Sequence, residues 1–178
     1  DVYVSNGANG DITAYTFGGN ATGIAAQSLT GDVTVVNDGS ISAESVNLYA
    51  TGINAQSIYG AVSVSNTGAI EAYSNGDANG IVASSAFDDV SVYNSGDITV
   101  TSRNGNAIGV YAFSYYGDVS FTSDGGSINA YAEYGYAVGI AALSPFGDVS
   151  VDNSSSITAN SQYYGALGIY ARSNGMVD

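Results

Sequence analysis

Hydrophobic and polar residues alternate along the chain in short runs that recur every 28 to 31 residues. A valine opens the first run of each unit, at Val2, Val33, Val62, Val90, Val119 and Val149. Two further runs per unit open near an isoleucine or valine, at Ile12, Ile41, Ile70, Ile98, Ile128 and Ile157, and at Ile24, Ile53, Ile81, Val110, Ile140 and Ile169. Because successive side chains of a β-strand point to opposite faces, this period of two predicts three short strands per unit.

Turn-forming residues separate these runs, and no segment has a sustained helical spacing of apolar residues. One unit is too small to bury an apolar face by itself, so equivalent strands must stack into parallel sheets. The sequence therefore predicts an all-β fold, a parallel β-helix (β-solenoid) of six coils of about 29 residues with three short strands each. Strand twist and the crossover rule favour right-handed winding.

The chain is predicted to be a single β-helix segment over residues 1–178. The predicted coils are 1–31, 32–60, 61–88, 89–117, 118–147 and 148–175, with the start of a seventh coil at 176–178. Neither terminal unit departs from the repeat as a capping unit would. We therefore expect either a piece of a longer array or a subunit whose ends stack on other copies.

Stacking would arrange equivalent side chains of successive coils in columns. An amide column is predicted, because a stacked amide donates to one neighbouring coil and accepts from the other, at Asn6, Asn37, Asn66, Asn94 and Asn153. The fifth unit has Ser123 in this place, and one extra residue among Asp124, Gly125 and Gly126 predicts a local bulge. An aromatic column is predicted before one turn, at Tyr59, Phe87, Tyr116 and Phe146.

Composition excludes much of the usual chemistry of protein sites. The 178 residues include no Lys, His or Cys, and the two basic residues, Arg103 and Arg172, stand against 16 acidic ones for a formal net charge of −14. The common general bases, nucleophiles and zinc ligands are therefore missing, and we expect no enzymatic activity and no cofactor. The negative charge argues against nucleic acid, and without an apolar run of about 18 residues we expect no direct membrane insertion.

Aspartate recurs immediately before the first valine of four units, at Asp32, Asp89, Asp118 and Asp148. On adjacent coils such carboxylates would lie about 5 Å apart, near the separation in retaining glycosidases. Because this aspartate belongs to the repeat, we interpret it as a turn residue whose side chain accepts a backbone N–H. Stacked carboxylates repel one another, so calcium ligands remain an alternative for Asp88, Asp89, Asp118 and Asp148.

Tyrosine is abundant, and five tyrosines fall at places predicted to face outward: Tyr15, Tyr73, Tyr131, Tyr111 and Tyr170. A tyrosine combines an apolar ring with a polar tip and can stack on sugar rings or meet a neighbouring fibre. The alternative is that these large β-formers shield exposed sheet. We interpret the five residues as a candidate adhesive surface.

Three phrases of the repeat carry a resemblance to a known family: Gly-Asp-Val-Ser-Val at 147–151, Asn-Asp-Gly-Ser-Ile at 37–41 and Ala-Val-Gly-Ile-Ala-Ala-Leu-Ser at 137–144. In these phrases the chain resembles the repetitive β-helical passenger region of bacterial autotransporters and related surface adhesins. The resemblance implies a non-enzymatic, extracellular, structural or adhesive segment of a bacterial cell-surface protein. Its expected partners are further coils of the same chain, other copies end to end, and glycans or molecules of a host or cell surface. A self-assembling extracellular fibre and a carbohydrate-active β-helix are the alternatives.

Overall fold

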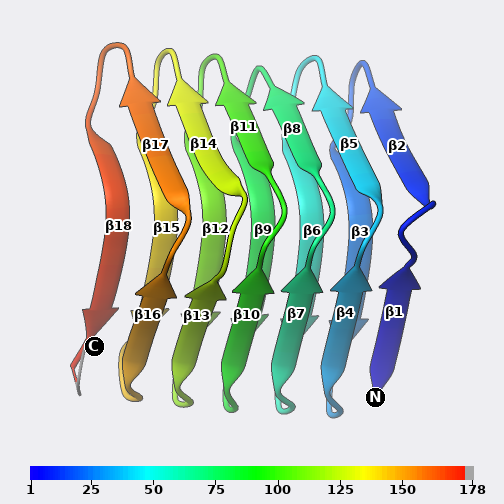
Figure 1. Cartoon of the computed structure of the whole chain (residues 1–178), viewed down its shortest axis with the longest axis vertical. Helices are drawn as coiled ribbons and strands as arrows, with labels where there is room; N and C mark the ends of the chain where they lie inside the picture. Colours follow the sequence, from blue (N-terminus) through cyan, green and yellow to red (C-terminus); the bar gives the residue numbers. More distant parts are fainter. Residues whose placement is uncertain (175–178) are drawn as a thin grey trace.

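The fold consists of eighteen β-strands, which repeat in groups of three along the chain (Figure 1). The structure is a computed structural model, and it describes residues 1–174. These residues contain no helix, and so none that could cross a membrane. The start of the predicted seventh coil, at 176–178, lies outside the described residues.

Three parallel sheets of six strands each run the length of the molecule. Sheet A contains β1 (Val2–Asn6), β4 (Val33–Asn37), β7 (Val62–Asn66), β10 (Val90–Asn94), β13 (Val119–Ser123) and β16 (Val149–Asn153). Sheet B contains β2 (Asp11–Thr16), β5 (Ser40–Ser45), β8 (Ile70–Ser74), β11 (Ile98–Ser102), β14 (Ser127–Ala132) and β17 (Ser156–Ser161). Sheet C contains β3 (Ala21–Ser28), β6 (Ala50–Ser57), β9 (Ala78–Ser85), β12 (Ala107–Ser114), β15 (Ala137–Ser144) and β18 (Ala166–Ser173).

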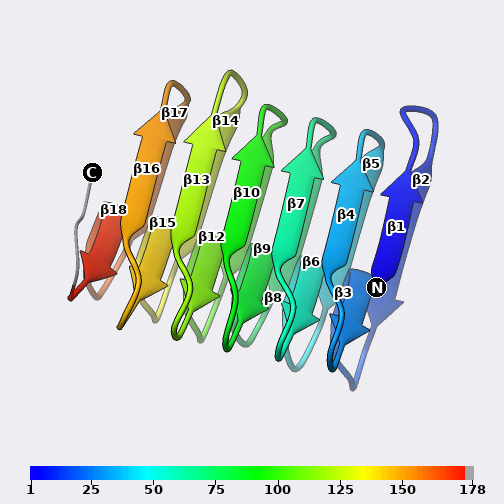
Figure 2. The same cartoon turned by 90° about the horizontal axis from the view of Figure 1, so that it is seen from below.

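Every strand pairs in register with its equivalent in the next coil, for example Val33 with Val62 in sheet A and Ile41 with Ile70 in sheet B. The predicted parallel β-solenoid of six coils with three strands each is therefore confirmed. As the coils advance from right to left in Figure 1, β1 and β2 rise in front and β3 descends behind. Figure 2 shows the same order from below, and this sense of winding is right-handed, as predicted.

The core lies inside the coil and is filled by the inward residues of all three sheets. In the second coil Val33 and Val35 of β4, Ile41 of β5, and Ile53 and Ala55 of β6 are buried together. Isoleucine and valine fill the wider parts of the section, while alanine lets opposite sheets approach closely. The core is thus a set of stacked layers of similar composition.

A glycine column in sheet C lies directly against sheet B, and the repeat in the sequence did not predict this contact. A Cβ atom added to Gly80 would lie 2.4 Å from Cγ2 of Ile98 and 2.4 Å from the Gly109 carbonyl oxygen. Equivalent close approaches to the isoleucine of sheet B occur at Gly23, Gly52, Gly109 and Gly139. Only a residue without a side chain fits between the two sheets at this place.

At the turn between β13 and β14 the fifth coil has one residue more than the second, third, fourth and sixth coils, and the first coil has a longer turn still, residues 7–10 between β1 and β2. The extra residue of this turn is accommodated by Gly125 and Gly126, which have φ angles of 98° and 68°. Such left-handed backbone conformations favour glycine because it lacks a Cβ atom. The predicted local bulge at 124–126 is confirmed.

Candidate functional site

The asparagines form a continuous amide column through the first four coils. The Nδ2 atom of each asparagine donates to Oδ1 of the next, at 2.8 Å from Asn6 to Asn37 and 2.7 Å for the two steps from Asn37 through Asn66 to Asn94. Each amide also donates to a carbonyl oxygen of its own coil, as Asn66 does to Gly68 at 2.9 Å. The predicted column is confirmed for these four residues, and its function is structural.

The amide column is interrupted at Ser123 in the fifth coil, whose hydroxyl contacts that of Ser155. Beyond this gap Asn153 still donates to the Ser155 carbonyl at 2.9 Å. Its Oδ1 atom is buried and accepts no hydrogen bond within residues 1–174. Asn153 is therefore not linked to the four-residue column above it.

Serine hydroxyls tie successive coils together at two corners. After sheet C, the Ser57 hydroxyl accepts from the Gly60 N–H at 3.0 Å and donates to the Gly31 carbonyl of the preceding coil at 2.9 Å. After sheet B, Ser102 makes the same pair of bonds with Gly105 and Gly76, at 3.0 and 2.6 Å. The serines recur visibly in the sequence, but this double role depends on the geometry of the corner.

The repeated aspartates act as acceptors for the backbone of the next coil. Oδ1 of Asp89 accepts from the Asp118 N–H at 2.8 Å, and Oδ1 of Asp118 accepts from the Asp148 N–H at 2.8 Å. Asp32 accepts from Ala61 in the same way, and Asp88 accepts from the following Asp89 N–H. The interpretation as turn acceptors is confirmed for Asp32, Asp89 and Asp118.

The calcium candidates Asp88, Asp89, Asp118 and Asp148 do not gather into a metal site. Within residues 1–174, no group of three or more His, Cys, Asp or Glu side chains is placed so that it could hold a metal ion. The Asp118 and Asp148 backbone N–H groups donate to carboxylates of this column and so offset part of their charge.

Substitutions at Asp118 separate an acceptor from a calcium ligand. Asp118→Asn keeps an oxygen for the Asp148 N–H, so we expect its free energy of unfolding to stay within about 0.5 kcal/mol of wild type. Asp118→Ala removes the acceptor and is expected to cost about 1 kcal/mol. Chemical denaturation with calcium and with a chelator measures both values. A calcium-dependent stabilisation that Asp118→Asn abolishes would contradict this role.

The aromatic column before the turn into sheet A is confirmed. The rings of Tyr59 and Phe87 stack with centroids 5.0 Å apart, and Tyr116 continues the stack at 5.2 Å from Phe87 and 5.2 Å from Phe146. Tyr115 packs edge-on against Phe146 at 5.2 Å. Through these contacts the aromatic column helps to hold successive coils together at this corner.

The five outward tyrosines do not form one surface. Tyr15, Tyr73 and Tyr131 share one row on the outer face of sheet B, whereas Tyr111 and Tyr170 lie in β12 and β18 of sheet C. Tyr111 is half-buried, and this burial raises the pKa of its hydroxyl. The single candidate surface expected from the sequence is therefore divided between two faces of the solenoid.

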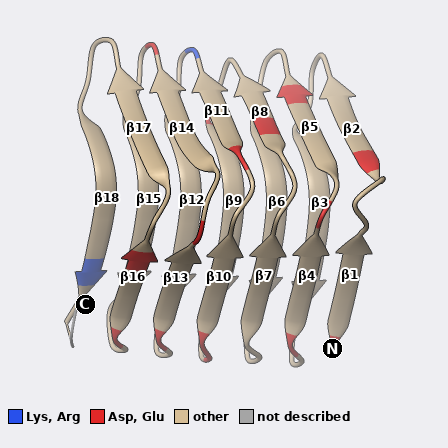
Figure 3. Ribbon diagram, viewed as in Figure 1, with Lys and Arg blue, Asp and Glu red and all other residues tan. Residues whose placement is uncertain are grey.

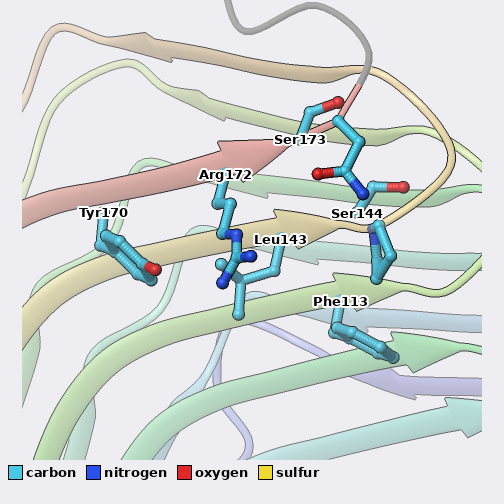
Figure 4. Close-up of a pocket in the computed structure, with 8 residues that line it drawn as sticks. Phe113, Leu143, Ser144, Tyr170, Arg172 and Ser173 are labelled. Atoms are coloured by element: carbon cyan, nitrogen blue, oxygen red, sulfur yellow. The ribbon is translucent and has the colours of Figure 1, made fainter.

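Sheet C carries a shallow pocket near β18 that the sequence reasoning missed. Its volume is about 260 Å³, and Phe113, Leu143, Tyr170 and Arg172 are among the residues that line it. Figure 4 shows the Arg172 side chain lying over Leu143, between the rings of Tyr170 and Phe113. The residues come from β12, β15 and β18, so only the in-register stacking of these strands brings them together.

Acidic residues are spread over the strands and turns, while basic residues occur at two places (Figure 3). Arg103 lies at the turn after β11 and pairs with Glu133 at 3.6 Å. The strands of sheet B contain Asp11, Glu44 and Glu71 but no Lys or Arg. The outer face of sheet B is therefore polar and negatively charged, and the rings of Tyr15, Tyr73 and Tyr131 are exposed on it.

No protein-family model, curated protein or solved structure matches the chain in a comparison with known proteins. The fold class is therefore defined by the stacked coils of the structure itself.

Proposed function

We propose that the chain is a non-enzymatic structural and adhesive segment of an extracellular bacterial cell-surface protein. One observation carries the proposal: the polar residues of the repeat are engaged in holding neighbouring coils together. Asn66, Ser57 and Asp118 each bond to an adjacent coil, so the residue types that could perform chemistry serve the scaffold. The outward aromatic residues differ from coil to coil and are what such a scaffold would display.

The bacterial surface origin is supported by the resemblance of the repeat phrases to autotransporter passenger regions. Antibodies raised against the purified chain test it on cells of the organism that encodes the protein. We expect labelling of intact, unpermeabilised cells. Labelling that requires permeabilisation would show an internal location and would overturn the surface proposal.

A fibre that grows by end-to-end stacking is the second candidate function. It is supported by the regular stacking of the coils, because equivalent strands pair in parallel and in register, as β4 does with β7. A second copy could continue the same pairing. Electron microscopy of the purified chain distinguishes the two candidates, because six coils rise only about 29 Å whereas a fibre extends far beyond that length.

A further inference from the structure

Three tyrosines on the outer face of sheet B repeat at every second coil. Tyr15 pairs in register with Glu44, which pairs with Tyr73, and Thr101 follows before Tyr131. The three tyrosines are 63%, 43% and 39% exposed. Because adjacent strands lie about 4.8 Å apart, neighbouring tyrosines of this row are separated by about 9.6 Å along the solenoid axis.

A second row of polar side chains runs parallel to the tyrosine row. It lies two residues earlier in each strand, about 6.6 Å away, and also points outward. Its members are in register with one another and carry hydroxyl, carboxylate or amide groups: Thr13, Ser42, Glu71, Thr99, Asn129 and Thr158. An elongated ligand on the tyrosine row would find hydrogen-bonding groups along one edge.

The charge of this face restricts the ligand to one without negative groups. Glu44 lies in the tyrosine row, Glu71 lies in the neighbouring row, and Asp11 begins the first strand of the sheet. The strands of sheet B contain no basic residue, and Arg103 at the edge already pairs with Glu133. Polymers bearing carboxylate, sulfate or phosphate groups would be repelled from this face.

We propose that the outer face of sheet B binds a neutral, extended β-1,4-linked polysaccharide that lies along the solenoid axis. Sugar rings with equatorial substituents have apolar C–H faces that stack on tyrosine. In an extended β-1,4-linked chain each sugar is turned over relative to the one before it, so the same ring face returns at every second sugar. That repeat is close to the length of two coils.

With a repeat of two sugars per two coils, the different side chains of the tyrosine row face different sugars. Tyr15, Tyr73 and Tyr131 stack on every second sugar, and Glu44 and Thr101 face the sugars between them. The parallel polar row then meets the hydroxyl groups at the edge of the chain. This inference rests on the proposed adhesive function and adds the class of ligand that the outer face of sheet B binds.

A pull-down with insoluble β-1,4-linked glucan and insoluble β-1,4-linked N-acetylglucosamine polymer tests the proposal. We expect at least one of them to deplete the full chain from solution, and α-1,4-linked glucan, which has another spacing, to leave it unbound. Tyr73→Ala should weaken binding about tenfold, as the loss of one stacking contact predicts. Tyr93→Ala removes an exposed tyrosine from sheet A and is the matched control, with binding unchanged.

A double substitution that keeps the composition tests the two-coil period itself. Glu44→Tyr with Tyr73→Glu moves one tyrosine by one coil, and we expect a loss of binding similar to that of Tyr73→Ala. Thermal unfolding of each variant establishes that it is folded. Wild-type binding by the double variant, equal binding of α-1,4-linked glucan, or binding to neither β-1,4-linked polymer would overturn this inference. If antibodies label intact cells, any of these results would overturn only the polysaccharide inference, and the proposed surface function would stand.

Discussion

Gly80→Ala is expected to lower the free energy of unfolding by about 3 kcal/mol or more. The added Cβ atom would lie 2.4 Å from Cγ2 of Ile98 and 2.4 Å from the carbonyl oxygen of Gly109. Relief requires β9 to move away from Ile98 of sheet B and also from the neighbouring strand β12, and the in-register pairs of β9 with β6 and β12 oppose both movements. The loss should be seen even though replacing glycine by alanine reduces the entropy of the unfolded chain, which by itself favours folding.

Gly168→Ala is the position-matched control for this prediction. Gly168 occupies the same place in β18, but a Cβ atom there would meet nothing within 4 Å. We expect its free energy of unfolding to stay within about 0.5 kcal/mol of wild type. Denaturant titration followed by circular dichroism measures both variants, and equal losses at the two positions would contradict the packing explanation.

Asn66→Asp is expected to cost about 3 to 5 kcal/mol at neutral pH. Asn66 is completely buried, and its Nδ2 atom donates to Oδ1 of Asn94 at 2.7 Å and to the Gly68 carbonyl at 2.9 Å. An ionised carboxylate has no hydrogen to donate, so it would place its charge against two acceptor oxygens in a dry core. Denaturant titration over a range of pH measures the effect.

The same variant should show a characteristic dependence on pH. Burial and the neighbouring acceptors would raise the folded-state pKa of the new carboxyl above its unfolded value of about 3.9. Its contribution to stability is then fully present below the unfolded pKa and is lost as the pH rises through the folded pKa. Asn66→Ser, which copies the natural Ser123, is the neutral control and should cost about 1 to 2 kcal/mol at every pH. A pH-independent loss in Asn66→Asp would contradict this account.

Most of the fold follows from the repeat, because a period of two within a period of about 29 residues leaves few ways to bury the apolar face. Val33, Ile41 and Ile53 could be assigned to three strands and to neighbours such as Val62 without any structure. The asparagine and aromatic columns could be predicted for the same reason, since identical residues in identical places must stack. The gap at Ser123 was visible as the one departure from the pattern.

The features that could not be predicted depend on distances between different sheets. The need for glycine at Gly80 arises from how closely sheet C approaches Ile98 of sheet B, which the repeat does not reveal. The pocket at Arg172 depends on which outward residues of three successive strands face one another. The outward tyrosines were recognised, but the sequence reasoning did not separate the row at Tyr73 from Tyr170 on another face.

The interruption of the amide column at Ser123 predicts the order in which the coils separate when the protein unfolds. In a solenoid each coil is held only by its immediate neighbours, so stability is a sum over the joints between them. The joints of the first four coils include an amide-to-amide bond, whereas the joints on either side of the fifth coil lack one, and Asn153 keeps an unsatisfied oxygen beyond it. Under heat or pulling force, the fifth and sixth coils should therefore separate before the first four, which remain wound together.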